Sequence, residues 1–309
     1  MARLLHISDL HFGMERPGLP EALVQQAPGW GADLTVISGD LTQRALASQF
    51  RPAAALAAAL PGPVLSIPGN HDMPLWNPFA RLFWPFAAWR RHIGDVLEPV
   101  IETRDMLVLG FNTADPYAWE RGRLPGDAMA RILTRLKKAR TGQLRIVAMH
   151  HPLHLPPQSD KSPMPGAEAA TLALAEAGVD IVLCGHLHAW AAAPYRVRSE
   201  GRNMLCVQAG TTLSTRLRGG QNDLNLIDWD GATVKVTRMV AEGLSLDFVP
   251  REVTYYTQSD TATGWTSHPE DAPSPPASNV LPLRRSPAPL DAAPSSDTQG
   301  KDRGRSGGL

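Results

Sequence analysis

The first part of the sequence alternates short apolar runs with longer helical segments. Apolar runs at residues 3–8, 34–38 and 64–67 have the length of buried strands, and residues 20–27 and 51–60 between them favour helices. Strands separated by helices of this length are typical of crossover units, which join parallel strands of one sheet. The sequence therefore predicts an α/β protein with a largely parallel sheet in this half.

The middle of the chain continues with strands and helices. Residues 100–111 are expected to form a hairpin, and Asp127 is expected to cap the N-terminus of a helix that runs to Arg140. Two further apolar runs, 144–149 and 179–184, read as strands, and residues 166–177 between them read as a helix. This pattern extends the alternation seen in the first part.

After residue 188 the pattern changes to short apolar runs separated by turn residues. The pair Asp230-Gly231 is the strongest hairpin signal in the chain. We interpret these runs as antiparallel strands that complete a second sheet. They are residues 195–197, 204–209, 224–229, 233–239 and 246–254.

The C-terminal region differs from the rest in composition. From Thr257 onward Pro, Ser, Asp, Gly and Thr dominate, with almost no apolar clusters. Such a composition buries too little surface to offset the entropy lost on ordering. The sequence thus predicts a folded domain at residues 1–256 and a disordered tail at residues 257–309.

Composition limits the classes of function. The chain has 309 residues, of which 43% are hydrophobic, and 30 basic residues balance 30 acidic ones. This balance gives no strong sign of nucleic-acid binding, which favours a basic excess. The two cysteines, Cys184 and Cys206, are expected to be buried thiols. Because no signal peptide or membrane-spanning run is evident, we expect a cytoplasmic protein without a transmembrane segment.

Polar side chains with metal-binding chemistry stand at the ends of five predicted strands. Because ligand sites of α/β sheets lie beyond the carboxyl ends of the strands, we expect these side chains to gather there. Oxygen and imidazole ligands without thiolate suit Mn, Fe, Zn or Co. Each motif alone also fits a turn or a buried histidine, but the recurrence predicts a metal centre. The residues are Asp9, His11, Asp40, Asn70, His71, Asp72, His150, His186 and His188.

Other polar residues near these motifs have open interpretations. Gly69 is expected to let the backbone bend before Asn70. His151 neighbours a predicted ligand but should point the other way along an extended backbone, so it is either scaffold or substrate-facing. His6 is expected to be a core histidine. Asn112 either lines the site or closes a turn.

The segment 75–93 is rich in aromatic residues at helical spacing, interrupted by Pro78 and Pro85. One interpretation is a pair of short helices that cap the core. The alternative is a lid that binds an apolar or anionic substrate.

The strand-end motifs also resemble those of a known family. In order, Asp9-x-His11, Gly39-Asp40, Gly69-Asn70-His71-Asp72, His150 and Gly185-His186-x-His188 look like the complete signature of the calcineurin-like metallophosphoesterases. The resemblance extends over roughly residues 3–240 and is nearest to the bacterial cyclic-nucleotide phosphodiesterase branch. It implies a four-layer α/β/β/α sandwich of two mixed sheets.

The resemblance further implies a dinuclear metal centre, with Mn or Fe expected first and Zn or Co as alternatives. One ion would take Asp9, His11, Asp40 and His188, and the other would take Asp40, Asn70, His150 and His186. His71 would contact the phosphate and either stabilise charge or protonate the leaving group. Asp72 would hydrogen-bond to His71 and orient it.

The function expected from these residues is hydrolysis of small-molecule phosphodiesters, with cyclic nucleotides as the leading substrates. One alternative is a lipid-precursor pyrophosphatase, in which residues 76–89 receive an acyl chain and Arg81, Arg90 and Arg91 face phosphates. A nuclease is another. The contrasting class is a scaffold that keeps the fold without catalysis. The oligomeric state is not predicted.

Overall fold

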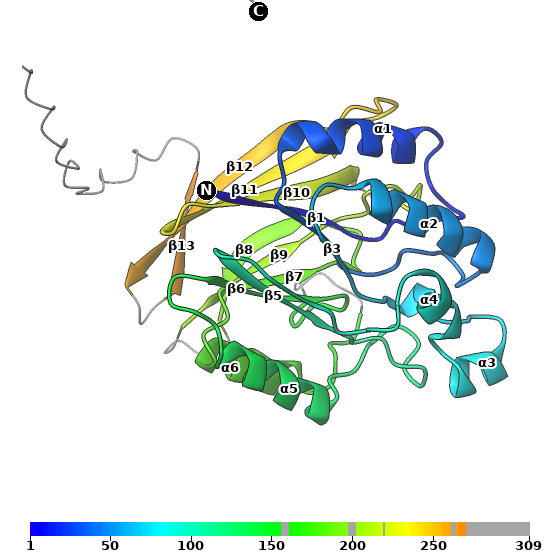
Figure 1. Cartoon of the computed structure of the whole chain (residues 1–309), viewed down its shortest axis with the longest axis horizontal. Coiled ribbons are helices and arrows are strands. Elements are labelled where there is room, and N and C mark those ends of the chain that lie inside the picture. The colour runs from blue at the N-terminus through cyan, green and yellow to red at the C-terminus, as the bar shows by residue number, and fades with distance from the viewer. Residues whose placement is uncertain (156–160, 197–201, 219, 261–263, 270–309) are drawn as a thin grey trace, which may run out of the picture. The chain divides into compact units, whose positions relative to one another are not determined.

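Two mixed β-sheets lie face to face at the centre of the protein (Figure 1). The computed structural model describes residues 1–155, 161–196, 202–218, 220–260 and 264–269, which fall within the unit Met1–Ala272. Cys184 and Cys206 are buried free thiols. Among the described residues, no helix combines the length and apolarity needed to cross a membrane.

The first sheet has seven strands in the order β13-β12-β11-β10-β1-β2-β3. Strands β1, β2 and β3 are parallel, whereas β10 to β13 form an antiparallel meander that joins β1 through β10. In this register Leu5 of β1 lies between Thr35 of β2 and Leu226 of β10. The strands are β1 Ala2–Ile7, β2 Leu34–Ile37, β3 Val64–Ser66, β10 Asn222–Trp229, β11 Thr233–Ala241, β12 Val249–Asp260 and β13 Gly264–Pro269.

The second sheet has six strands in the order β4-β5-β6-β7-β9-β8. Its four central strands are parallel, and the edge strands β4 and β8 are antiparallel to their neighbours. The predicted hairpin at residues 100–111 is present as β4 and β5. The strands are β4 Val100–Glu102, β5 Met106–Phe111, β6 Leu144–Met149, β7 Ile181–Cys184, β8 Ala191–Tyr195 and β9 Met204–Gln208.

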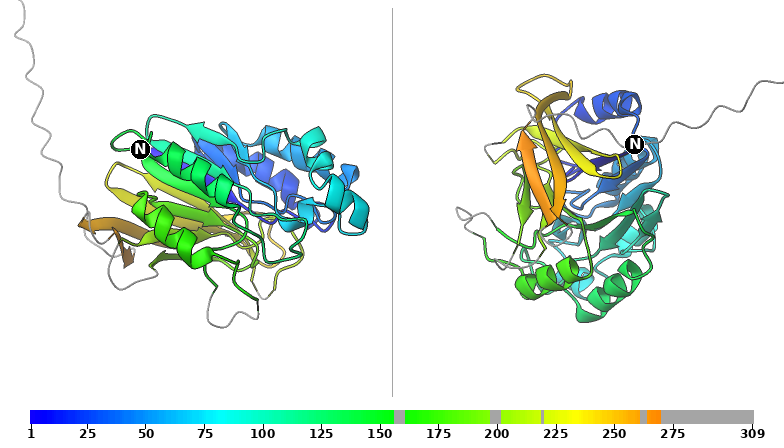
Figure 2. Two further views of the ribbon diagram at one scale, coloured as in Figure 1. Left: turned by 90° about the horizontal axis from the view of Figure 1, so that it is seen from below. Right: turned by 90° about the vertical axis from the view of Figure 1, so that its left-hand side faces the viewer.

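Helices cover the outer face of each sheet (Figure 2). Helices α1, α2 and α4 pack on the first sheet, and α5 and α6 pack on the second. The helices are α1 Leu19–Gln26, α2 Ala47–Ala59, α3 Pro78–Phe83, α4 Ala87–His92, α5 Gly126–Leu136 and α6 Ala167–Glu176, with short 3-10 helices η1 Ala27–Trp30 and η2 Asn70–Asp72.

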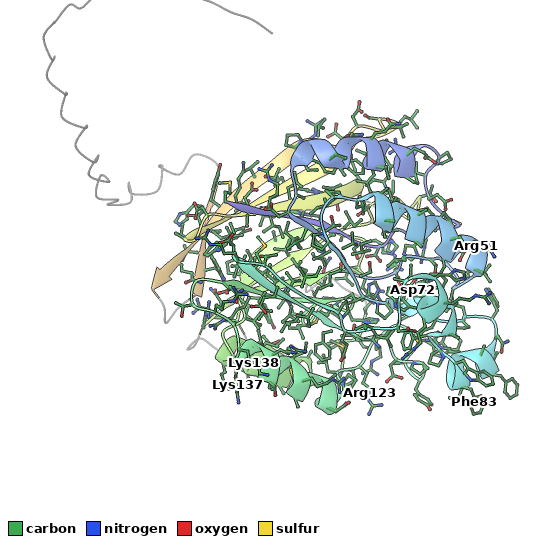
Figure 3. The ribbon with its side chains drawn as sticks, viewed as in Figure 1. Arg51, Asp72, Phe83, Arg123, Lys137 and Lys138 are labelled. Atoms are coloured by element: carbon green, nitrogen blue, oxygen red, sulfur yellow. The ribbon has the colours of Figure 1, made fainter. Side chains whose placement is uncertain are left out.

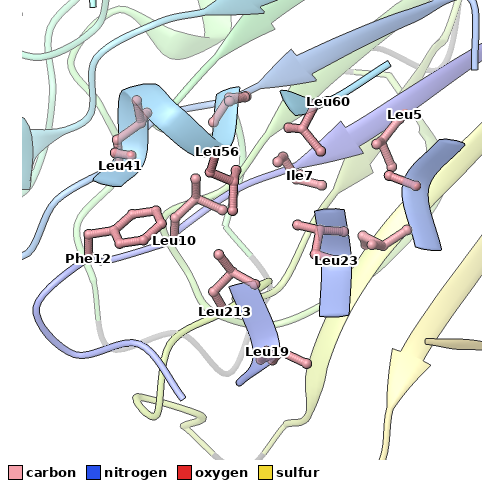
Figure 4. Close-up of a cluster of buried hydrophobic side chains, with 14 of the residues drawn as sticks. Leu5, Ile7, Leu10, Phe12, Leu19, Leu23, Leu41, Leu56, Leu60 and Leu213 are labelled. Atoms are coloured by element: carbon pink, nitrogen blue, oxygen red, sulfur yellow. The ribbon is translucent and has the colours of Figure 1, made fainter. Parts of the chain in front are cut away.

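Three apolar layers follow from the alternation of side chains along the strands. In β1, Leu4 faces the second sheet, whereas Leu5 and Ile7 face the helices. Figure 4 shows Leu23 of α1 and Leu56 of α2 around Ile7. Because both faces of the parallel strands are covered, their sequences are apolar throughout rather than alternating. The α/β fold class with two mixed sheets is therefore confirmed.

Two helices begin elsewhere than predicted. Helix α2 starts at Ala47, so Pro52 lies in its second turn, where a proline removes one helical hydrogen bond. Helix α5 is preceded by Pro125, and Asp127 lies inside its first turn rather than at the cap. The Asp127 carboxylate instead accepts a hydrogen bond from Arg131, one turn further on, at 2.7 Å.

The folded chain also continues past residue 256, where the sequence predicts the tail to begin. Strand β12 runs to Asp260, and β13 adds a further strand. Isolated aromatic residues explain the difference, since Tyr256 and Trp265 are buried within otherwise polar sequence. Trp265 packs 6.2 Å from Trp229 and donates its indole N–H to the carbonyl oxygen of Asp180 at 3.0 Å. Residues 270–309 of the predicted tail lie outside the described residues.

We predict that Trp265→Ala lowers the free energy of unfolding by about 3–5 kcal/mol, because it empties a buried aromatic site and removes one of the two hydrogen bonds to the Asp180 carbonyl oxygen. Urea denaturation would measure the change. Ser267→Ala, an exposed position on the same strand, is the control and should change little. Equal stability of the two variants would contradict the role given to β13.

Candidate metal centre

The predicted ligands lie in loops that leave the carboxyl ends of five strands. Asp9 and His11 follow β1, Asp40 follows β2 and Asn70 opens η2 after β3. The second sheet contributes the rest, which follow β6 and β7. They are His150, His186 and His188. All seven side chains are buried, and their ligand atoms come together between the two sheets.

The backbone at these strand ends is unusual. In the described part of the chain, seven non-glycine residues have positive φ, and five of them are predicted ligands. A left-handed conformation costs a non-glycine residue about 1 kcal/mol or more, so it persists only where surrounding structure imposes it. The five residues are Asp9, His11, Asp40, His186 and His188, with φ from 47° to 72°.

Two glycines next to the ligands are required for close approach. Gly69 has φ −103° and ψ −176°, an extended conformation open to any residue, so the expected sharp bend is wrong. A Cβ atom at Gly69 would instead lie 2.1 Å from Oδ1 of Asp40. At Gly185 it would lie 2.3 Å from Oδ2 of Asp9. Each glycine lets one loop pack directly against the carboxylate of another.

The first group of ligand atoms surrounds one point. Nε2 of His11 and Nε2 of His188 are 3.0 Å apart. Oδ1 of Asp9 lies 3.2 Å from Nε2 of His188, and Oδ2 of Asp40 lies 3.6 Å from Nε2 of His11. Two nitrogens and two carboxylate oxygens at these separations form a set of donors suited to one cation.

The second group shares an atom with the first. Oδ2 of Asp40 also lies 3.3 Å from Nε2 of His150. Oδ1 of Asn70 is 3.2 Å from Nε2 of His150 and 3.2 Å from Nδ1 of His186. A single oxygen of Asp40 therefore faces both groups of donors.

The Nδ1 atoms of two of these histidines are already hydrogen-bonded to backbone carbonyl oxygens. Nδ1 of His188 donates to the Arg216 carbonyl oxygen at 2.7 Å, and Nδ1 of His150 donates to the Ser38 carbonyl oxygen at 2.9 Å. These bonds set the tautomers and leave each Nε2 lone pair directed into the site.

The carboxylates of Asp9 and Asp40 also accept hydrogen bonds from groups around the site. Oδ2 of Asp9 accepts from the Ser8 hydroxyl at 2.7 Å, and Oδ1 of Asp40 accepts from the His71 backbone N–H at 2.8 Å. Oδ1 of Asp9 is buried without a hydrogen-bond partner among the described residues. A buried carboxylate oxygen without a donor is costly unless a cation compensates it. The residues present thus fit a metal ion.

The protonation states of the buried side chains favour the binding of cations. Burial opposes ionisation of Asp40, but the adjacent His150 and His71 imidazoles outweigh it and hold the pKa of this carboxyl well below its usual value. Burial lowers the pKa of His11 to about 4, so this imidazole is neutral. Burial also lowers the pKa of His150, but the Asp40 carboxylate raises it to about 9 overall. A bound metal ion would replace that proton.

His71 lies at the margin of the first group and is half-buried. Its ring centroid is 4.9 Å from that of His11. Nδ1 contacts the backbone carbonyl oxygen of Gln43 at 2.9 Å, which makes Nδ1 the protonated nitrogen of the neutral ring. Nε2 lies 3.4 Å from a guanidinium nitrogen of Arg216. The ring is thus oriented by Gln43.

The expected hydrogen bond from Asp72 to His71 is wrong. Asp72 is buried, and its carboxylate accepts backbone N–H groups of Gly69, Leu41 and Thr42, together with the Thr42 hydroxyl, at 2.8–3.1 Å. Burial, followed by the nearby Asp40 charge, raises the pKa of Asp72 to about 7. Asp72 therefore ties the loop after β3 to the loop after β2 and supports the site from outside.

Three other histidines are placed by the structure. His151 points into the site rather than away, with its ring 4.6 Å from that of His186 and Nδ1 2.8 Å from the Thr113 hydroxyl. His6 contacts Ser38 within the core, as predicted. His154 stacks on Tyr195 at 3.9 Å.

Some site residues carry no motif that sequence reasoning could have used. Arg216 stands beside His71, and the Lys161 amino group lies 3.0 Å from Nε2 of His186. Lys161 lies late in the loop between β6 and α6, and Arg216 lies in the loop between β9 and β10. Asn112, which had two interpretations, accepts the Ala114 backbone N–H at 3.0 Å and so closes a turn.

Together, two mixed sheets and a buried Asp/His/Asn centre at their strand ends define a metal-binding α/β/β/α fold. Comparison with known proteins agrees. The family model described as calcineurin-like phosphoesterase matches residues 2–190. Since this is more than half of the chain, the protein belongs to the calcineurin-like phosphoesterase family, a family of metal-dependent phosphoester hydrolases, as the motifs predict.

A solved structure shows the same fold. A purple acid phosphatase from yellow lupin (Lupinus luteus) seeds aligns with TM-score 0.60 and 15% identity, over 81% of this chain and 53% of its own. The present chain therefore spans about half of that enzyme. A phosphopantetheinyl hydrolase from Mycobacterium tuberculosis aligns with TM-score 0.46 and 15% identity, over 68% of this chain and 90% of its own. No curated protein matches the sequence.

We predict that Asp40→Asn loses both metal ions together, because one oxygen serves both groups. Asn70→Ala should lose only the ion of the second group. Elemental analysis of metal-loaded protein would count the ions. Asp228→Asn, a buried carboxylate paired with Arg3 elsewhere, is the control and should keep both. Retention of one full ion by Asp40→Asn would contradict a bridging role.

Asp72→Ala is expected to lower the free energy of unfolding by about 3 kcal/mol or more, since several buried N–H groups lose their acceptor. Urea denaturation of metal-free protein would measure this loss. Asp72→Asn, which keeps one acceptor oxygen, should be intermediate, and the pH profile of its kcat should keep the wild-type shape. A shifted profile with unchanged stability would restore the orienting role for Asp72.

Proposed function

We propose that this protein is a dinuclear metal-dependent phosphoesterase that hydrolyses phosphodiesters of small molecules, with 3′,5′-cyclic nucleotides as leading candidates. The observation that carries the proposal is the position of Oδ2 of Asp40 within reach of both groups of nitrogen and oxygen donors. A carboxylate shared in this way suits two ions a few ångströms apart, the spacing used in phosphoester hydrolysis.

The ligand sets support a division of the ions between the two groups. Asp9, His11, Asp40 and His188 would hold one ion, and Asp40, Asn70, His150 and His186 would hold the other. Mn or Fe fits this chemistry, and Zn or Co is also compatible. When bound, the ions supply Lewis-acid activation of the phosphate and of a water molecule.

The chain's own residues supply proton transfer and charge. With Nδ1 held by Gln43, protonated His71 carries its mobile proton on Nε2 and donates it to the leaving alkoxide oxygen. Arg216, whose guanidinium lies beside Nε2, stabilises negative charge on the phosphate oxygens. The backbone N–H of His71 donates to the Asp40 carboxylate. His71 therefore both orients the shared carboxylate and supplies the proton.

A cavity beside the centre supports a small anionic substrate. It encloses about 680 Å³, within the usual range for small-molecule sites, and His151 and His186 form part of its wall. Among the described residues that line it, Lys161, Arg121 and Arg218 stand against one acid, Glu120. This excess of positive charge favours a substrate with phosphate or other anionic groups next to the scissile ester.

The alternative functions, a lipid-precursor pyrophosphatase, a scaffold and a nuclease, are supported less well. Arg81, expected to face phosphates in a lipid pyrophosphatase, is buried and donates to backbone carbonyl oxygens of Pro116 and Pro74. That part of the interpretation is wrong. A scaffold without catalysis has no need for seven buried ligands of matching geometry, and the balanced charge of the chain does not favour a nuclease.

We predict that the Mn-loaded protein hydrolyses an aryl phosphodiester, and that His71→Ala retains both ions while kcat falls by about 10²–10⁴-fold, the usual contribution of a general acid. Elemental analysis and a chromogenic assay would measure the two effects. His154→Ala, a histidine stacked on Tyr195 outside the centre, is the control and should keep its rate.

A parallel assay should use cyclic nucleotides, diphosphate esters and phosphomonoesters. Hydrolysis of cyclic nucleotides above the others would support the leading substrate. An inactive Mn-loaded wild type that binds less than one ion per chain would overturn the enzyme proposal, and a fully active His71→Ala would overturn only the role of His71.

A further inference from the structure

Six aromatic side chains form an exposed group at one end of the described fold, here called the aromatic tip. Each exposes between 60% and 75% of its surface. Large apolar residues exposed together are uncommon on a protein surface and mark interaction sites. The residues are Trp76, Phe79, Phe83 and Trp84 in and around α3, and Tyr117 and Trp119 in the loop after β5.

The two segments of the tip are held together by a buried arginine. Arg81 of α3 is 3% exposed and donates to the carbonyl oxygen of Pro116 at 2.9 Å. Its guanidinium lies 4.8 Å from the centre of the Trp119 ring. Asn77 caps the N-terminus of α3 by accepting the Ala80 N–H at 2.9 Å. The rings are thus presented by a fixed framework.

The aromatic tip is tied to the metal centre through the chain. Trp76 is the fourth residue after Asp72, and Tyr117 is the fourth after Thr113, which contacts His151. Four residues span about 14 Å at most. Both segments therefore start at the centre, and the rings lie on the side of the molecule to which the strand ends point.

Positive charge is carried by the same segments as the rings. In the segments 73–95 and 113–123 the exposed charged residues are four arginines and two acids, Asp95 and Glu120. Arg44 adds a further charge, with its guanidinium 4.9 Å from the Trp76 ring. In Figure 3, Phe83 projects from the margin of the molecule, and Arg51 and Arg123 are labelled on the same side. The four arginines are Arg90, Arg91, Arg121 and Arg123.

We propose that the aromatic tip docks the protein on an anionic lipid surface. Tryptophan and phenylalanine insert at the boundary between headgroups and acyl chains, and arginines around them pair with lipid phosphates. A second copy of this chain fits less well, because a two-fold contact through the tip would bring its arginines against their own counterparts. An anionic surface neutralises the same charges.

Docking in this way would hold the metal centre close to the lipid headgroups. If the proposed phosphoesterase function holds, the substrates would include phosphoesters carried in a lipid surface. The docking itself does not depend on catalysis, so it can be tested separately.

The test is sedimentation of the full chain with phosphatidylcholine vesicles that contain or lack phosphatidylglycerol. We expect binding to the phosphatidylglycerol vesicles, and at least a tenfold weaker partition for the triple variant Trp76→Ser, Phe79→Ser and Phe83→Ser. The control, Leu244→Ser, removes an exposed apolar side chain (95% exposed) outside the tip and should bind as the wild type does. Hydrolysis of a soluble aryl phosphodiester should be equal in all three proteins.

Three results would overturn the proposal. They are a wild type that stays in solution with both kinds of vesicle, a triple variant that binds as tightly as the wild type, and binding that does not depend on phosphatidylglycerol. A dimer that forms in the wild type and is lost in the triple variant, without vesicle binding, would assign the aromatic tip to a second copy instead. Failure of hydrolysis alone leaves the vesicle result standing, so the two proposals fail separately.

Discussion

The buried carboxylate of Asp40 is the point on which the rest of the site depends. One oxygen accepts the backbone N–H of His71, and the other faces both groups of candidate ligands. Gly69 has no side chain, so the loop after β3 can approach this carboxylate directly. A single anion thus sets the position of the loop, the candidate ligands and His71.

Left-handed backbone at the strand ends explains how so many polar groups converge. His186 and His188 are two residues apart, so an extended strand would already turn both side chains to one face. Both residues instead have positive φ, and their imidazoles reach different groups of donors, His188 the first and His186 the second. The free-energy cost of this backbone conformation is offset by hydrogen bonds such as the one from the His186 N–H to Asp9. Backbone strain therefore occurs at the same positions as the candidate ligands.

Hydrophobic periodicity and turn residues are local signals, and they predict the strands and the side chains at the strand ends. The prediction that all the late strands are antiparallel and complete the second sheet is wrong, because β10 to β13 join the first sheet through β1, and β9 lies parallel to β7. The sequence does not predict what a side chain contacts across the fold. Asp72 adjoins His71 in sequence, but its carboxylate binds the loop after β2. Trp265 anchors β13, whose otherwise polar sequence does not indicate a strand. In segment 75–93 the pattern indicates two short helices, as observed, but cannot show that Trp89 is buried while Trp76 is exposed.

The ligands come from both sheets, four from the first and three from the second. In an unfolded chain Asp9 and His188 are separated by most of the domain, so neither group of ligands exists until the two sheets have joined. Ions bound there would act as cross-links that form last. Binding of metal would then occur only in chains whose two sheets have already packed together. A chain without metal would lack these cross-links between the two sheets.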